Sequence, residues 1–91
     1  MDDNLLLIGL KVDLGISTPA YDERLLARIA QARAEIAAMG ATLTDTTRDR
    51  ELVIMYAAWL WRDRLTNEPM PRMLRYALNN RVLSQKASAA V

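Results

Sequence analysis

Paired carboxylates are the side chains of this sequence whose type and spacing could support acid–base chemistry. They occur three times, as Asp2 with Asp3, Asp22 with Glu23, and Asp49 with Glu51. Two neighbouring carboxylates can divide the roles of proton donor and proton acceptor. The first two pairs fall where helices are expected to begin, however, and acidic side chains there stabilise the helix dipole. The third pair lies in a charged turn, so a structural use is expected for all three.

Other catalytic groups are missing from the sequence. The chain contains no His and no Cys, the usual general base and the usual thiolate ligand. Ser17, Ser84 and Ser88 therefore have no His partner for a hydrolytic triad. Gly9 and Gly15 stand outside any phosphate-binding motif. We expect a protein that is not an enzyme and that carries no metal and no cofactor.

The composition is that of a globular helical chain. Apolar residues make up 52% of the 91 residues and charged residues 25%. Ala, Leu, Arg and Met, which favour helices, dominate, while Gly and Pro occur three times each. The sequence predicts an all-α fold, a compact bundle of about four helices over residues 4–14, 22–39, 47–65 and 71–85. Residues 1–86 form its single domain, and residues 87–91 form a short flexible C-terminal tail.

The first of these segments permits two interpretations. Apolar residues alternate along it at a period of two, which is typical of a strand. Leu6, Leu10 and Leu14 equally fit one face of a helix, with Gly15 in the position of a C-terminal cap. We favour the helix because no second strand is predicted for a strand to pair with.

The third segment is unusually apolar. No charged residue occurs between positions 52 and 61. A helix that is apolar on every side must be covered on every side, which three further helices of a small domain can hardly achieve. Part of this helix is therefore expected to meet another subunit. In the fourth segment, the inner face is predicted to carry Met73, Leu74, Ala77, Leu78 and Val82.

Trp59 and Trp61 lie two positions apart and so point to different faces of the third helix. Trp59 is the better candidate for the core. Trp61 lies beside Arg62 and Arg64, a combination favoured at interfaces. It is predicted as an interface anchor, with packing under the first helix or a loop as the alternative.

Charge is distributed unevenly along the chain. Residues 1–23 carry a net charge of −4 and residues 61–91 a net charge of +4, within a total of +1. Such ends can pair head to tail between copies, with acidic Asp22 and Glu23 among the interface residues. The alternative is that both ends are solvated surface.

The last helix carries a basic face that consists of Arg72, Arg75, Arg81 and Lys86, with Tyr76 among them. This face could follow a phosphate backbone, as in a small nucleic-acid-binding or regulatory module. An acidic protein partner fits it equally well. A sequence pI near 8.1 is low for a dedicated DNA-binding protein.

The apolar run at residues 5–10 is too short to cross a membrane and follows acidic rather than basic residues. An intracellular, soluble protein without membrane contact is therefore expected.

The order of segments resembles a known family. The resemblance rests on four stretches: residues 10–16 (LKVDLGI), the acidic start at 21–23 (YDE), the apolar helix at 52–64 and the closing stretch 70–81 (MPRMLRYALNNR). Together they resemble the small head–tail connector proteins of tailed bacteriophages and prophages, also called adaptor or head-completion proteins. Longer members can have a longer connection between the last two helices than residues 66–70 provide here.

This resemblance implies a structural virion protein at the head–tail interface, present in the bacterial cytoplasm before assembly. Such proteins form a ring of about twelve copies beneath the portal protein. The ring extends the channel for packaged DNA and docks the tail or a stopper protein. By position, Arg72, Arg75, Arg81 and Lys86 would face the portal.

Overall fold

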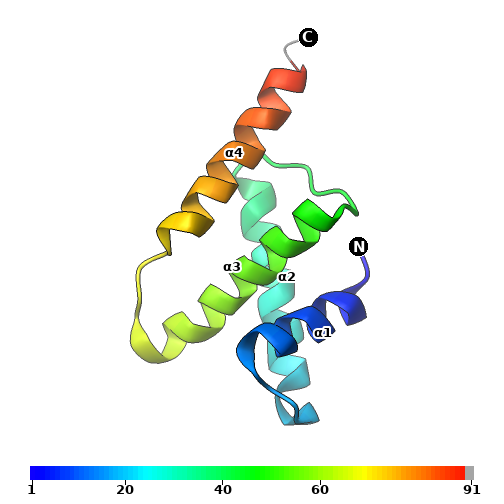
Figure 1. Ribbon diagram of the computed structural model, residues 1–91, viewed down its shortest axis with the longest axis vertical. Helices are drawn as coiled ribbons and strands as arrows, with labels where there is room; N and C mark the ends of the chain where they lie inside the picture. The colour runs from blue at the N-terminus through cyan, green and yellow to red at the C-terminus, as the bar shows by residue number, and fades with distance from the viewer. Residues whose placement is uncertain (90–91) are drawn as a thin grey trace.

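The computed structural model describes residues 1–89 and contains four α-helices joined by short connections (Figure 1). These are α1 (Asp3–Leu14), the short 3-10 helix η1 (Pro19–Tyr21), α2 (Asp22–Ala38), α3 (Thr47–Thr66) and α4 (Arg72–Ala89). No strand occurs among these residues, so the all-α prediction is confirmed. Helix α4 continues beyond residue 85 into the segment predicted as a tail, and residues 90 and 91 of that segment lie outside the described part.

Helix α1 settles the alternatives left open for the first segment. The Asp2 side chain accepts a hydrogen bond from the Asn4 amide at 2.8 Å and caps the N-terminus. Gly15 ends the helix with a φ of 71°, a left-handed conformation that glycine adopts without strain. Leu6 and Leu10 are fully buried, whereas Ile8 and Val12 are exposed. The apolar residues that alternate in the sequence therefore lie on two different faces of a helix.

One hydrophobic core takes side chains from all four helices. Helices α1, α2 and α3 pack against one another, and α4 packs on α3. The fully buried large apolar side chains come from each of them: Leu6, Leu10, Leu25, Ile29, Ile36, Val53 and Leu74. In Figure 1, α3 runs through the middle of the molecule with α2 behind it. Helix α3 therefore serves as the central element.

The apolar stretch of α3 is covered largely by its own chain. Seven of its apolar residues are buried: Leu52, Val53, Ile54, Tyr56, Ala57, Ala58 and Trp61. Met55 retains partial exposure, and Trp59 and Leu60 are half-buried. Helices α1 and α2 pack on this helix together and α4 adds a further cover, so its own chain covers more of it than the sequence indicates. The contact of its remaining surface with another subunit stays a prediction.

Helix α4 is attached to the rest of the molecule along one side only. Leu74 and Leu78 anchor it in the core, while Met73, predicted on the inner face, is 73% exposed. The molecule is elongated, with extents of 47, 28 and 18 Å. Figure 1 shows α1 toward one end of the long axis and α4 toward the other. Helices α1 and α4 are thus separated in space, whereas the end of α3 lies beside the acidic segment, where Trp61 meets Tyr21.

Candidate partner-binding surface on the last helix

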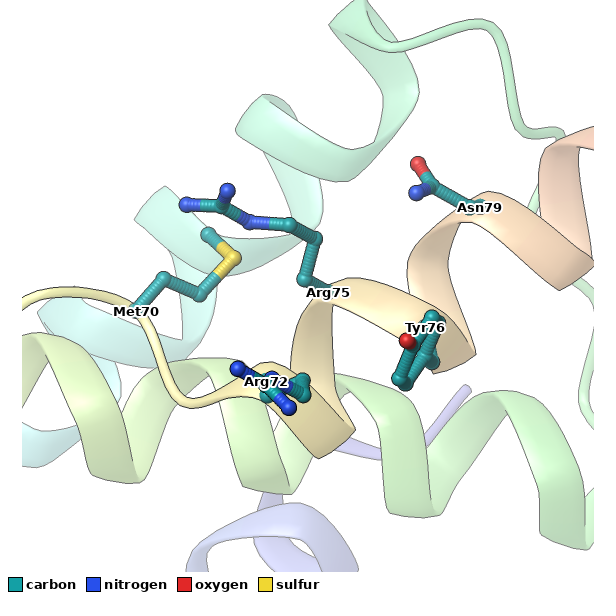
Figure 2. A pocket seen from close by; sticks show the side chains of 5 residues that line it. All are labelled: Met70, Arg72, Arg75, Tyr76 and Asn79. Carbon is teal, nitrogen blue, oxygen red and sulfur yellow. The ribbon is translucent and has the colours of Figure 1, made fainter.

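A shallow hollow lies where α4 begins. Its lining consists of Met70, Arg72, Arg75, Tyr76 and Asn79. Figure 2 shows Arg72 and Tyr76 projecting from the first turns of α4, with Arg75 and Asn79 directed to another side of the same helix. Two prolines flank Met70 and keep residues 69–71 out of the helix, so that α4 starts at Arg72. In the first turn of α4, Arg72, Met73 and Arg75 are exposed, whereas Leu74 is buried.

Two rows of side chains run along the outer surface of α4. Met73, Tyr76 and Leu83 recur at helical spacing and remain mostly exposed; we call them the α4 apolar stripe. Arg72, Arg75 and Lys86 lie beside them and form the α4 basic edge. Within residues 1–87, whose side chains the structure describes, these three cations take part in no ion pair. They are available to an acidic partner.

Arg81, the fourth cation predicted to face a partner, occupies a different position. Its Nε donates to Asp49 Oδ1 at 2.7 Å and its Nη2 to Asp49 Oδ2 at 3.2 Å. Nη2 also donates to the Thr42 carbonyl at 2.6 Å. The Arg81 side chain is only 13% exposed. Its guanidinium is therefore engaged within the chain, where it fastens α4 to the start of α3 and to the preceding loop.

The electrostatics of Asp49 reflect this arrangement. Burial alone would raise its pKa, but hydrogen bonds from Arg81 and Thr44 outweigh burial and lower the pKa from 3.8 to about 2. The same ion pair raises the pKa of Arg81. Both groups therefore stay charged near neutral pH, and the bidentate pair is kept.

Gln85 extends the attachment of α4 by one turn. Its Nε2 donates to the Gly40 carbonyl at 2.9 Å, and its Oε1 accepts from the Thr42 amide at 2.6 Å. The loop after α2 thus receives two side chains of α4, Arg81 and Gln85. These contacts fix which side of α4 faces inward and, with it, where the basic edge points.

Trp61, predicted as an interface anchor, is only 8% exposed in the single chain. The Tyr21 ring meets its edge at a centroid distance of 5.8 Å, and the Arg64 guanidinium lies 3.9 Å from its centroid. Trp59, predicted for the core, is half-buried and donates through Nε1 to the Glu68 carbonyl at 3.1 Å. The order of burial is therefore opposite to the one expected, because η1 folds over Trp61.

The remaining residues predicted for a subunit interface lie apart from α4. Asp22 pairs with Lys11 at 2.8 Å, an ion pair that ties the start of α2 to α1. Glu23 and Arg62 are exposed, and Arg62 borders a hollow beside Leu65. The structure brings neither of them to the α4 surface.

The carboxylates considered for acid–base chemistry are dispersed. Asp2 caps α1, Asp3 pairs with Arg33 at 2.7 Å, and Asp49 pairs with Arg81. In the described part of the chain, no three metal-binding side chains gather closely enough to hold a metal ion. Each of these three carboxylates thus serves a helix end or an ion pair.

One exposed surface was missed by the sequence analysis. Leu5, Ile8 and Val12 form a row on the outside of α1. Their three- and four-residue spacing is present in the sequence, but Ile8 and Val12 also fit the alternation with a period of two, which obscures a second apolar face. A helix with apolar residues on two faces gives this mixed pattern.

No described helix is both long enough and apolar enough to cross a membrane. Comparison with family models, with characterised proteins and with solved structures finds no match to this chain.

Proposed function

We propose that this chain is a structural assembly protein, a head–tail connector or adaptor of a tailed bacteriophage or prophage. In this role, copies of the chain form a ring beneath the portal protein, extend the DNA channel and dock the tail or a stopper protein. The α4 basic edge is one of the contact surfaces that hold this assembly together. The proposal combines the resemblance in helix order with the surface that the structure places on α4.

The observation that carries the proposal is the outer surface of α4. Three cations without an ion-pair partner in the described chain lie beside three exposed apolar side chains on one helix. Exposed apolar side chains rimmed by charge mark interaction sites, because their burial in a complex is favourable and the charges select the partner. The inner side of the same helix is fixed by Arg81 and Gln85, so this surface is held in place before a partner binds.

Co-expression with a candidate portal protein, followed by affinity purification and electron microscopy, tests this proposal. The expected result is a ring density on the portal that disappears in the double variant R72E/R75E. A matched control is R24E, because Arg24 is an exposed cation on α2 that makes no ion pair within residues 1–87. Wild-type chain that gives no ring with its portal would refute the connector function.

A small nucleic-acid-binding module is the second candidate. It is favoured by the position of Tyr76 beside Arg72 and Arg75 at one hollow, where an aromatic ring and two cations could meet a phosphate backbone. A gel-shift titration of duplex and single-stranded DNA at several salt concentrations tests it. Three phosphate contacts predict a fall in log affinity with log salt of slope about −2 to −3. Absence of a shift at low salt excludes this candidate.

A further inference from the structure

Helix α1 presents an outward surface that its own chain leaves uncovered. Its apolar residues Leu5, Ile8 and Val12 are 57%, 59% and 78% exposed, while Leu6 and Leu10 on the opposite face are fully buried. Three of the seven apolar residues of α1 therefore lie on the outside, where they contribute little to the stability of the isolated fold. A second contact surface explains their presence.

Acidic side chains border this row. Asp2 and Asp13 lie at either end of α1, both exposed, and neither forms an ion pair within residues 1–87. The third acid of α1, Asp3, is already paired with Arg33. We call Leu5, Ile8 and Val12, together with these two unpaired carboxylates, the α1 acidic stripe.

The α1 acidic stripe and the outer surface of α4 are complementary. Each consists of three large apolar side chains on one helix, bordered by carboxylates on α1 and by Arg72, Arg75 and Lys86 on α4. Figure 1 places the two helices toward opposite ends of the long axis of the molecule. The two surfaces therefore cannot satisfy each other within one chain.

From this arrangement we infer that the α1 acidic stripe of one copy docks on the α4 apolar stripe and basic edge of the next copy. The occupant of each surface is a second copy of this chain, because each surface carries three exposed apolar side chains on one helix and the bordering charges are opposite. The contact is heterologous, since it joins two different surfaces. Repetition of a heterologous contact builds a ring when its rotation closes, and this contact would supply the subunit interface of the proposed ring; in that role it rests on the proposed function.

Two variants, each defective in one of the two surfaces, test the contact in solution. V12E places a charge in the α1 acidic stripe and leaves α4 intact, whereas M73E places a charge on α4 and leaves α1 intact. Both positions are highly exposed, so both variants should fold, which circular dichroism verifies. L65E is the control, because Leu65 is equally exposed and belongs to neither surface.

Sedimentation velocity at concentrations up to about 1 mM should show association of the wild-type chain and of L65E, and at least about tenfold weaker association of V12E and of M73E alone. A mixture of V12E and M73E retains one intact surface of each kind. It should therefore form a 1:1 complex and nothing larger. Higher salt should weaken this complex, because opposite charges border the contact.

The contact is overturned if the wild-type chain stays monomeric, if the variants associate like the wild type, or if the mixture forms no complex. The portal experiment separates this result from the proposed function. Rings that form on the portal with both V12E and M73E would remove the inferred contact and leave the connector function standing. A chain that passes the mixing test but never binds a portal would retain the contact and lose the connector function.

Discussion

Asp49 joins three parts of the molecule through one carboxylate. It accepts hydrogen bonds from the Thr44 amide at 2.8 Å, from the Thr44 hydroxyl at 2.9 Å and from Arg81. Its own amide donates to the Thr46 hydroxyl at 3.2 Å, which caps α3. A buried carboxylate that kept its charge without these donors would cost several kcal/mol, so the loop, α3 and α4 depend on one another here.

Stability is expected to fall in acid because of Asp49. Its folded pKa is about 2 and the unfolded value is 3.8, so the stabilisation is complete above pH 3.8 and is lost as the pH falls through about 2. The difference corresponds to roughly 2 kcal/mol of unfolding free energy. Urea unfolding followed by circular dichroism between pH 5 and pH 2 measures it, and D49N should abolish this part of the pH dependence.

D45N is the matched control for this measurement. Asp45 precedes α3 and pairs with Arg50 at 2.8 Å on the surface, where an ion pair contributes little. The variant should keep both the stability of the wild type and its loss in acid. If D49N and the wild type lost stability in parallel between pH 5 and pH 2, the buried ion pair would not be the cause.

The capping interaction at the start of α3 shows what the sequence allows at the scale of a residue. A capping box pairs a Thr with an acidic or amide side chain three residues later. Thr46 and Asp49 have this spacing, and the Thr46 half is present. The carboxylate instead accepts hydrogen bonds from Thr44 and Arg81, and Arg81 lies 32 residues further along the chain. Local pattern alone does not contain that information.

At the scale of elements, the four helices follow from local signals. Asp2, Gly15 and Thr46 mark helix ends by their own hydrogen bonding and backbone preferences, and the structure places the ends there. The exposed side of each helix was harder to predict. Met73 is exposed rather than buried, because Arg81 sets the rotation of α4. Trp61 is buried rather than exposed, because η1 covers that part of α3. Those are contacts between distant segments.

Gly9 permits the close approach of α1 to α3. A Cβ at this position would lie 2.6 Å from the Ile54 δ-carbon, too close without a shift of that side chain. Alanine also favours a helix over glycine by about 1 kcal/mol. The two effects oppose each other in G9A. The I54V variant lacks the δ-carbon. We therefore expect the change that G9A makes in the free energy of unfolding to be about 1 kcal/mol more favourable in an I54V background than in the wild type.

A double-mutant cycle measures this coupling from the unfolding free energies of G9A, I54V and G9A/I54V. As a control, pairing G9A with V53A tests a core residue on the same helix that does not lie within 4 Å of the added Cβ. That pair should be close to additive. Equal effects of G9A in the wild-type and I54V backgrounds would show that the two helices do not meet at Gly9.

At the scale of the molecule, α4 is the most separable part. It is anchored by the buried Leu74 and Leu78, packs Ala77 and Val82 partly against the core, and is hydrogen-bonded through Arg81 and Gln85, whereas α2 and α3 are packed along their lengths. Amide hydrogen exchange should therefore show α4 opening at a lower free energy than α2 and α3. L74A should lower the protection of α4 amides further while it leaves that of α2 amides largely unchanged.

An exposed truncation on the same helix, L83A, serves as the control, because Leu83 contributes to the outer surface and not to the core. It should leave the exchange of α4 amides close to the wild-type rate. Exchange of α4 and α2 amides at the same free energy would instead mean that the molecule opens only as one unit.

The hydrogen bond from Trp59 to the Glu68 carbonyl gives the protein an optical reporter. The indole is half-buried and touches the segment that leads directly into α4, so a displacement of that segment would change its hydration and its fluorescence emission. Replacement of Trp61 by Phe would leave Trp59 as the single emitter, because the sequence contains two tryptophans. Docking on α4 could then be followed in real time, without a label, from a site that no docking partner needs to cover.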